Sequence, residues 1–294
     1  MKKKVQFYSE GKKIAGDLYF PNDMQDHEPS PAIILCHGFV GIKELLLPAY
    51  AERFAQHGLA ALVFDYRGFG ESEGERGQLI PQQQVTDIRN AITFVQTLKE
   101  INGEHIGLWG TSFGGANIIY VASMDRRIKA LTVQLTFASG ERMITGDFGE
   151  KELDKLESTL RKVRERAVTK NKILRLNPDQ ILTDEESQAF YAHIVERYPK
   201  MQTRIPLSTL QHIMEHNPQD VIANVTCPIL IIAAERDTVC PAQESQILFE
   251  HANEPKKLLM LEGCKHYDAY EGTHFEKGIK STIEWFSRYL NVRE

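Results

Sequence analysis

In its middle third the chain reads Ile106-Gly107-Leu108-Trp109-Gly110-Thr111-Ser112-Phe113-Gly114-Gly115. The apolar residues at the start of this stretch are typical of a buried strand, and residues 116–123, which follow it, have helical character. A serine on a tight turn from strand to helix is forced outward at the top of a sheet, and its neighbours must be small for the turn to close. The G-x-S-x-G pattern therefore predicts that Ser112 is an exposed nucleophile. The structural alternative is a glycine-rich turn capped by a serine.

Other short apolar runs resemble the strand before Ser112, and they lie at residues 32–36, 59–64 and 229–234. Strands that are apolar on both faces are expected inside a parallel sheet covered by helices on each side. Residues 85–98 and 279–290 place apolar side chains at helical spacing. Residues 5–9 and 14–20 alternate and are expected to form an antiparallel pair. The pattern predicts an α/β fold with a mostly parallel central sheet and a ligand site at the carboxyl ends of its strands.

Residues 140–220 interrupt this alternation, because they contain helix signals and no convincing strand. A heavily charged segment carries an apolar seam made of Leu153, Leu156, Leu160, Val163 and Ala167. Two further helices are expected at residues 184–198 and 207–216, each ended by a proline. We expect this segment to be an inserted helical cap that overhangs the strand ends and shapes substrate access. The core then consists of residues 1–139 and 221–294.

A serine hydroxyl needs a base to become a good nucleophile, and the base needs an orienting acid. In this architecture the partners follow in the order serine, acid, histidine. Asp237 follows the apolar strand at residues 229–234, and His266 follows a strand-like run at residues 257–261. We therefore expect His266 to be the general base and Asp237 to be the acid that orients it. Other acids that would serve are Glu235, Asp147 and Glu141.

Acyl transfer also requires two backbone N–H groups aimed at the carbonyl oxygen as it gains charge. One should come from Phe113, directly after the nucleophile. The other should come from the loop after the strand at residues 32–36, where Gly38 lets the backbone turn and leaves the Phe39 amide as the second donor. His37 is expected to have a structural role, hydrogen-bonding this loop.

These motifs, in this order, resemble those of the α/β-hydrolase superfamily. The matching stretches are His37-Gly38-Phe39, residues 65–72 (DYRGFGES), the Ser112 turn, Arg236-Asp237 and Gly263-x-x-His266. The resemblance runs from about residue 30 to the end and is closest to dienelactone-hydrolase-like and dipeptidyl-peptidase-like serine hydrolases, including capped bacterial esterases. It implies an α/β-hydrolase fold, a serine–aspartate–histidine triad, and Phe39 and Phe113 as oxyanion donors. Lys265 departs from the pattern, because many members carry a glycine just before the histidine.

The sequence therefore predicts a cofactor-independent serine hydrolase that cleaves a carboxylic ester or thioester of a small to medium acyl substrate through an acyl-enzyme. The same groups could cleave an amide, a peptide or a C–C bond, or pass the acyl group to another acceptor, and no residue decides among these reactions. An inactive protein of this fold that binds a ligand or a partner is the alternative from another class. The intact serine, acid and histidine argue against it.

Several other signals have a structural interpretation that we prefer. His212-Ile213-Met214-Glu215-His216 matches the zinc-binding pattern H-x-x-E-H, but no clear third ligand accompanies it, so we expect a packed helix and no metal. Cys240 and Cys264 each lie close to a predicted catalytic residue, and we expect ordinary buried thiols rather than a redox pair. Aromatic residues that could line an acyl pocket, or simply belong to the core, are Phe137, Phe148, Phe190 and Tyr191.

Composition excludes several classes of protein. The chain has 294 residues with 35 Lys+Arg and 40 Asp+Glu, a formal charge of −5, so no basic field argues for nucleic acid or an anionic membrane. No apolar run approaches the roughly 18 residues of a membrane span, and polar residues follow the basic start where a signal peptide needs an apolar stretch. Four cysteines are no disulfide scaffold in a chain of this length. We expect a cytoplasmic enzyme, with a homodimer left open.

Overall fold

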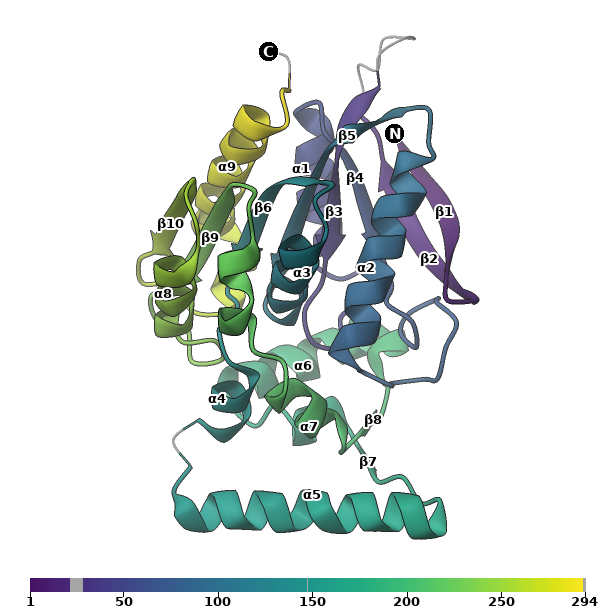
Figure 1. Ribbon diagram of the computed structural model, residues 1–294, viewed down its shortest axis with the longest axis vertical. Helices are drawn as coiled ribbons and strands as arrows, with labels where there is room; N and C mark the ends of the chain where they lie inside the picture. The colour runs from purple at the N-terminus through teal and green to yellow at the C-terminus, as the bar shows by residue number, and fades with distance from the viewer. Residues whose placement is uncertain (22–28, 147, 293–294) are drawn as a thin grey trace.

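The computed structural model describes residues 1–21, 29–146 and 148–292 (Figure 1). Its main sheet has eight strands in the order β1-β2-β4-β3-β5-β6-β9-β10. These strands are β1 (Lys2–Ser9), β2 (Lys12–Tyr19), β3 (Ser30–Cys36), β4 (Ala60–Phe64), β5 (Ile101–Thr111), β6 (Ile128–Gln134), β9 (Ile229–Ala234) and β10 (Lys256–Leu261). The β1–β2 and β2–β4 pairs are antiparallel and every other pair is parallel. The predicted α/β-hydrolase fold is confirmed.

Helices cover both faces of this sheet. The α-helices of the described chain are α1 (Leu47–Gln56), α2 (Pro81–Gln96), α3 (Phe113–Met124), α4 (Gly140–Thr145), α5 (Glu150–Lys170), α6 (Glu185–Arg197), α7 (Thr209–Met214), α8 (Ala242–His251) and α9 (Gly272–Tyr289). Strand β3 shows how the faces divide, because Ile34 packs in the cluster that contains α2 and α3, whereas Leu35 packs in the cluster that contains α1 and α9. A strand covered on both faces needs an uninterrupted apolar run, as the sequence has there. In the described part of the chain, no helix is long and apolar enough to cross a bilayer.

Strand β6 is an element that the sequence pattern did not predict. Thr132 and Gln134 interrupt its apolar residues, yet both are fully or almost fully buried in this central strand. The Gln134 side-chain amide donates to the Tyr50 hydroxyl at 2.9 Å. The hydrogen bond to Tyr50, a residue far away in the sequence, therefore compensates for the burial of the polar Gln134 side chain in a core strand.

The expectation of helices alone between residues 140 and 220 is wrong in one detail. A two-residue antiparallel ladder joins β7 (Arg175–Leu176) to β8 (Ile205–Pro206). Such a short ladder has no room for a periodic pattern, so sequence periodicity could not reveal it. Helices α5 and α6 occupy the predicted places, and α7 is shorter than predicted.

Figure 1 shows α4, α6 and α7 beneath the carboxyl ends of the parallel strands, with α5 farthest from the sheet. Helix α5 has 21 residues, but Val163 is its one buried residue. The seam residue Leu156 lines the cavity described below, and Leu160 lines a second hollow beside α7. Helix α5 is therefore held to the rest of the chain by few side chains.

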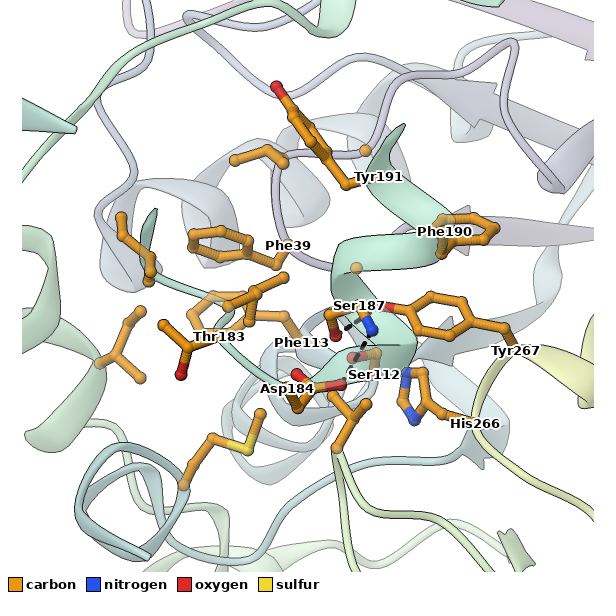
Figure 2. Close-up of a pocket in the computed structure, with 18 of the residues that line it drawn as sticks. Phe39, Ser112, Phe113, Thr183, Asp184, Ser187, Phe190, Tyr191, His266 and Tyr267 are labelled. Atoms are coloured by element: carbon orange, nitrogen blue, oxygen red, sulfur yellow. Dashed lines mark hydrogen bonds between the residues drawn. The ribbon is translucent and has the colours of Figure 1, made fainter. Parts of the chain in front are cut away.

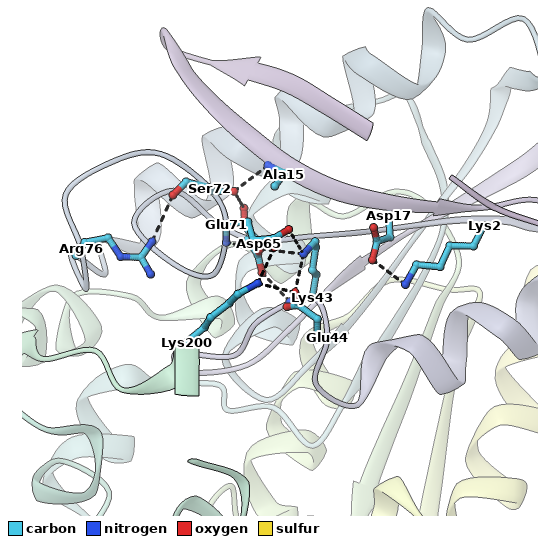
Figure 3. A network of polar contacts seen from close by, with 10 residues as sticks. All are labelled: Lys2, Ala15, Asp17, Lys43, Glu44, Asp65, Glu71, Ser72, Arg76 and Lys200. Carbon is cyan, nitrogen blue, oxygen red and sulfur yellow. Dashed lines mark hydrogen bonds and ion pairs between the residues drawn. The ribbon is translucent and has the colours of Figure 1, made fainter. Parts of the chain in front are cut away.

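A cluster of charged residues fixes the loop that follows β4 (Figure 3). Asp65 accepts from the backbone amides of Lys43 and Glu71 at 2.7 and 2.8 Å, and a Cβ on Gly70 would lie 2.1 Å from its carboxyl carbon. The ammonium of Lys43 also contacts Glu71 at 2.8 Å, and Lys200 approaches the same carboxylate at 2.6 Å. These hydrogen bonds lower the pKa of Glu71 to about 2. Glu71 therefore stays ionised and links the loop to the segment that carries Lys200.

Candidate active site

Ser112 lies on a strained turn between β5 and α3. Its φ of 51° and ψ of −124° are unusual for a residue with a side chain, and such a backbone costs on the order of 1–3 kcal/mol. The turn closes only because glycines follow it. A Cβ on Gly114 would lie 2.1 Å from the Cys36 carbonyl oxygen, and one on Gly115 would lie 2.8 Å from the Thr136 Cβ. This geometry is the strand–turn–helix context that the sequence predicted.

Asp237 and His266 come from two loops at the ends of β9 and β10. The Asp237 Oδ2 atom lies 2.7 Å from His266 Nδ1, and both side chains are almost completely buried. The other carboxylate oxygen, Oδ1, accepts from the backbone amides of Val239 and Cys240 at 2.8 and 2.7 Å. The carboxylate is thus fixed at both oxygens, and it can orient the imidazole and stabilise a positive charge on it.

Ser112 and His266 line the same cavity, and Figure 2 shows their side chains next to one another. Within the described part of the chain, the Ser112 hydroxyl makes no hydrogen bond to the imidazole, and Cys240 Sγ lies 4.0 Å from its oxygen. Catalytic hydrogen bonds are often long in proteins without substrate and tighten when substrate binds.

Two backbone amides lie beside Ser112 without a partner in the described chain, those of Phe39 and Phe113. Phe113 is the first residue of α3, where a helix leaves its amides unpaired and carries a partial positive charge. The loop that contains Phe39 contacts the nucleophile directly, because a Cβ on Gly38 would lie 3.1 Å from the Ser112 Cβ. Both amides are available to a negatively charged oxygen.

His37 has the structural surroundings predicted for it. Its Nδ1 lies 3.1 Å from the Gly38 carbonyl oxygen, and its ring packs edge-on against Tyr66 at 4.8 Å. Burial lowers the pKa of His37 to about 4. The ring is therefore neutral at pH 7 and supports the loop before Phe39.

The cavity above Ser112 has a volume of about 410 Å³ and is mainly apolar. The aromatic side chains that the sequence offered as lining do line it: Phe137, Phe148, Phe190 and Tyr191. Among the described residues that line it there is no lysine or arginine, and Asp184 is the one carboxylate. Asp184 caps α6 by accepting from the Ser187 amide at 2.8 Å. The cavity thus offers apolar contact and no cation for an anionic group.

Two of the other candidate acids, Glu235 and Glu141, make no hydrogen bond to His266 in the described chain. Glu235 is exposed and accepts from the Gly263 amide at 2.7 Å, and Glu141 is an exposed residue in the first turn of α4. Asp147 lies outside the described residues. Of the described candidates, Asp237 is the acid that contacts the imidazole.

The H-x-x-E-H pair occupies two different environments. His216 is buried and its ring stacks on Tyr120 at 4.1 Å and on Phe113 at 5.9 Å, and burial lowers its pKa to about 3. His212 instead lines the hollow between α5 and α7. No cluster of three or more potential metal ligands occurs in residues 1–21, 29–146 and 148–292. Cys240 and Cys264 are both buried free thiols.

Two tyrosines near His266 were not predicted from the sequence. Tyr267 packs edge-on against the imidazole at 4.9 Å, and Tyr270 approaches it at 6.4 Å. The Tyr270 hydroxyl forms a hydrogen bond of 2.6 Å with the hydroxyl of Thr111, the residue before Ser112. Both tyrosines belong to one 3₁₀ turn, in which residues three apart lie on the same side. Their spacing after the histidine was the available signal.

Comparison with known proteins gives a consistent result. A family model described as serine aminopeptidase, S33, matches residues 27–272. A 31.7 kDa protein from the traX–finO intergenic region of Escherichia coli is 39% identical over 261 residues, which cover 88% of this chain and 91% of that protein. The thiohydrolase aneE of Aspergillus aculeatus is 28% identical over 309 residues, covering 97% of this chain and 93% of the relative.

Solved structures agree with the fold. The crystal structure of the α/β hydrolase GrgF from Penicillium sp. sh18 matches with a TM-score of 0.84 and 25% identity, covering 99% of both chains. A relative named polyketide transferase grgF, also from Penicillium, is 29% identical over 266 residues, which cover 88% of each chain. The similarity therefore extends through the segment between β6 and β9 as well as the sheet.

Proposed function

The chain belongs to the serine aminopeptidase S33 family of the α/β-hydrolase superfamily, and on this premise we propose that it is a serine hydrolase that cleaves a carboxylic ester or thioester. One observation carries the proposal. A strained turn presents the Ser112 hydroxyl to an apolar cavity that also contains His266, whose imidazole is held by Asp237 at 2.7 Å. Strain of this kind is maintained where the surrounding structure imposes it, often at active sites.

In the proposed reaction, His266 takes the proton of Ser112 through Nε2 while the serine oxygen attacks the carbonyl carbon. The carbonyl oxygen gains a negative charge and accepts hydrogen bonds from the Phe39 and Phe113 amides. The tetrahedral intermediate then collapses, and the alcohol or thiol leaves with the proton from His266. A water activated by the same imidazole hydrolyses the acyl-enzyme, releasing the acid and the free serine. Asp237 accepts from Nδ1, which leaves Nε2 of the neutral imidazole free to take the serine proton, and it stabilises the imidazolium that forms.

The lining of the cavity favours a substrate with a neutral, largely apolar acyl group. Its volume of about 410 Å³ lies within the range of about 300–1,000 Å³ typical of small-molecule sites. A free carboxylate or phosphate inside it would find no cationic side chain among the described lining residues. The relative named thiohydrolase favours a thioester as one substrate.

We also propose that residues 140–220 act as a cap over a core formed by residues 1–139 and 221–294. Both parts contribute to the lining of the cavity, with Phe39 and Phe137 from the core side and Met143, Phe190 and Leu207 from the cap side. Substrate would then enter between them, and the composition of the cap would set acyl-chain preference.

Acyl transfer is the second candidate, because one relative is named a polyketide transferase. The chemistry is the same up to the acyl-enzyme, and an alcohol or amine acceptor then replaces water. Product analysis with an ester donor separates the two reactions. Free acid alone supports hydrolysis, whereas an acylated acceptor formed in preference to acid supports transfer.

The test of the proposed function is Ser112→Ala, assayed on p-nitrophenyl esters and acyl thioesters of increasing chain length and probed with a fluorophosphonate. We expect turnover to fall by at least about 10³-fold and labelling to vanish, because the nucleophile is gone. Ser123→Ala is the matched control, since this serine lies on the same helix and its hydroxyl bonds to the Tyr120 carbonyl. Wild-type turnover in Ser112→Ala, or an unlabelled wild-type protein without esterase activity, would exclude the proposal.

A further inference from the structure

Helix α6 makes a direct contact with the loop that carries His266 (Figure 2). The Ser187 hydroxyl lies 3.0 Å from the Tyr267 hydroxyl, and the Phe190 ring stacks on the Tyr267 ring at 4.0 Å with an interplanar angle of 16°. Ser187 and Phe190 are three residues apart, so they lie on the same face of the helix. One face of α6 therefore contacts both the ring and the hydroxyl of Tyr267, which belongs to the loop that carries His266.

Tyr267 in turn contacts the imidazole. Its ring lies 4.9 Å from the His266 ring at an angle of 74°, an edge-to-face arrangement. The hydrogen bond that His266 Nδ1 donates to Asp237 fixes the position of this nitrogen but leaves the ring free to rotate about that bond. A flat neighbour packed against one side restricts this rotation, so the tyrosine ring sets the direction of Nε2.

The imidazole also has Tyr270 as a more distant neighbour at 6.4 Å, and the Tyr270 hydroxyl is hydrogen-bonded to Thr111 beside Ser112. The two tyrosines thus connect His266 to two different parts of the chain. Tyr270 links it to the strand that presents Ser112, and Tyr267 links it to helix α6. A second and weaker contact joins α6 to the neighbouring loop, because Thr238 donates to Glu186 at 3.2 Å on the surface.

The Ser187–Tyr267 hydrogen bond is partly buried, with Ser187 buried and Tyr267 half-buried. Ser187 is 1% exposed, and burial raises the pKa of the Tyr267 phenol, so the phenol stays neutral at physiological pH. Loss of one partner leaves the other without a hydrogen bond in a buried place, which costs more than loss of both.

We propose that Tyr267 is a positioning residue that couples helix α6 to His266, so that the position of α6 over the cavity and the orientation of the imidazole toward Ser112 depend on one another. This proposal rests on the proposed function and adds a requirement to it. Substrate that fills the cavity and presses on α6 would then act on the base as well as on the acyl pocket.

The experiment compares wild type, Tyr267→Phe, Ser187→Ala and the double variant. Each is assayed for kcat and KM on a p-nitrophenyl ester and for the rate of fluorophosphonate labelling. We expect each single variant to lower kcat and the labelling rate about three- to tenfold, as the loss of one hydrogen bond allows, with KM changed less than about twofold. The double variant should be no slower than the single variants, because both changes remove the same contact.

Tyr198→Phe is the matched control, since Tyr198 follows α6, lies outside the cavity lining and has no hydrogen bond to the histidine loop in the described chain. It should behave as wild type. Thermal unfolding of every variant shows whether a loss comes from the fold, and Ser187→Ala carries the test if Tyr267→Phe does not fold.

The outcomes separate this proposal from the one it rests on. Wild type that neither hydrolyses the ester nor reacts with the probe removes the proposed function. Active wild type with unchanged Tyr267→Phe and Ser187→Ala variants overturns the coupling alone. The coupling is also overturned if the two single effects multiply in the double variant, or if KM rises while kcat and labelling stay at wild-type rates.

Discussion

Gly114 lies so close to Cys36 that a Cβ on the glycine would come within 2.1 Å of the cysteine's carbonyl oxygen. The first turn of α3 therefore rests directly on the end of β3. This contact brings the Ser112 turn and the Phe39 loop together, so that one backbone approach determines the positions of the proposed nucleophile and of a proposed oxyanion donor.

Gly114→Ala should consequently destabilise the protein by about 1–3 kcal/mol, because neither backbone can move aside without distorting the sheet. Fluorophosphonate labelling should fall as the turn is displaced. Gly278→Ala is the control, because that glycine lies in helix α9, where a Cβ would be 3.6 Å from its nearest neighbour, and alanine favours a helix by up to about 1 kcal/mol. Equal stability of the two variants in urea denaturation would contradict the prediction.

Asp237→Asn should reduce kcat by about 10³- to 10⁴-fold with little loss of stability. The two amides that bond to Oδ1 require an oxygen there, so the new side-chain NH₂ must face His266. The imidazole then accepts at Nδ1 and carries its proton on Nε2, where it cannot act as a base. Glu235→Gln, which changes an exposed carboxylate on the same loop, should stay within about twofold of wild type in steady-state kinetics; a comparable loss in that variant would refute this assignment.

Stability should fall with acidification below about pH 6.5. Burial lowers the pKa of His37 to about 4 and of His216 to about 3, from an ordinary value of 6.5. Between its lowered pKa in the folded chain and pH 6.5, each of these histidines binds a proton in the unfolded chain but not in the folded one. Each therefore lowers the free energy of unfolding by about 1.4 kcal/mol for every pH unit of acidification in that range. The stabilisation is complete above pH 6.5 and is lost as the pH falls.

His216→Phe provides the comparison for this pH dependence. It keeps an aromatic ring against Tyr120 but removes one titrating group. Free energies of unfolding in urea at pH 7, 6 and 5 should show a slope smaller by about one proton than in wild type. Identical slopes in the two proteins would mean that His216 is not buried as a neutral group.

Lys43 and Lys200 belong to one ion-pair cluster but should contribute very differently to the free energy of unfolding. The Lys43 side chain is 3% exposed and contacts the carboxylates of Glu44 and Glu71, whereas the Lys200 side chain is 48% exposed. Lys43→Met leaves the fully buried Asp65 carboxylate, 3.6 Å from the ammonium, without its cation and should cost about 3–5 kcal/mol. Lys200→Met should cost at most about 1 kcal/mol. Chemical denaturation measures both, and similar losses would disprove the distinction.

The sequence predicted the central strands because they are covered on both faces. Ile33 and Ile34 point to opposite clusters and are both fully buried, so an unbroken apolar run was required there. Strand β6 escaped prediction because Thr132 and Gln134 are polar, and the Tyr50 hydroxyl that pairs with Gln134 lies 84 residues away. Such compensation is a property of the tertiary structure and leaves no local pattern.

The candidate site was predictable to the extent that topology fixes it. Parallel strands end at one edge of a sheet, so loops after three of them had to bring Ser112, Asp237 and His266 near one another. The contact between Ser187 and Tyr267 was beyond such reasoning, because it depends on how α6 lies over the strand ends. Neither residue belongs to a motif, and helical periodicity alone does not say what a helix covers.

Helix α5 buries one residue, Val163, yet its Leu156 reaches the cavity that contains Ser112. Mutations that lengthen, shorten or replace this helix would leave the eight-stranded sheet and the positions of Ser112, Asp237 and His266 unchanged. If the proposed function is correct, changes confined to this peripheral helix would alter which acyl chains fit the cavity, with little effect on the stability of the sheet.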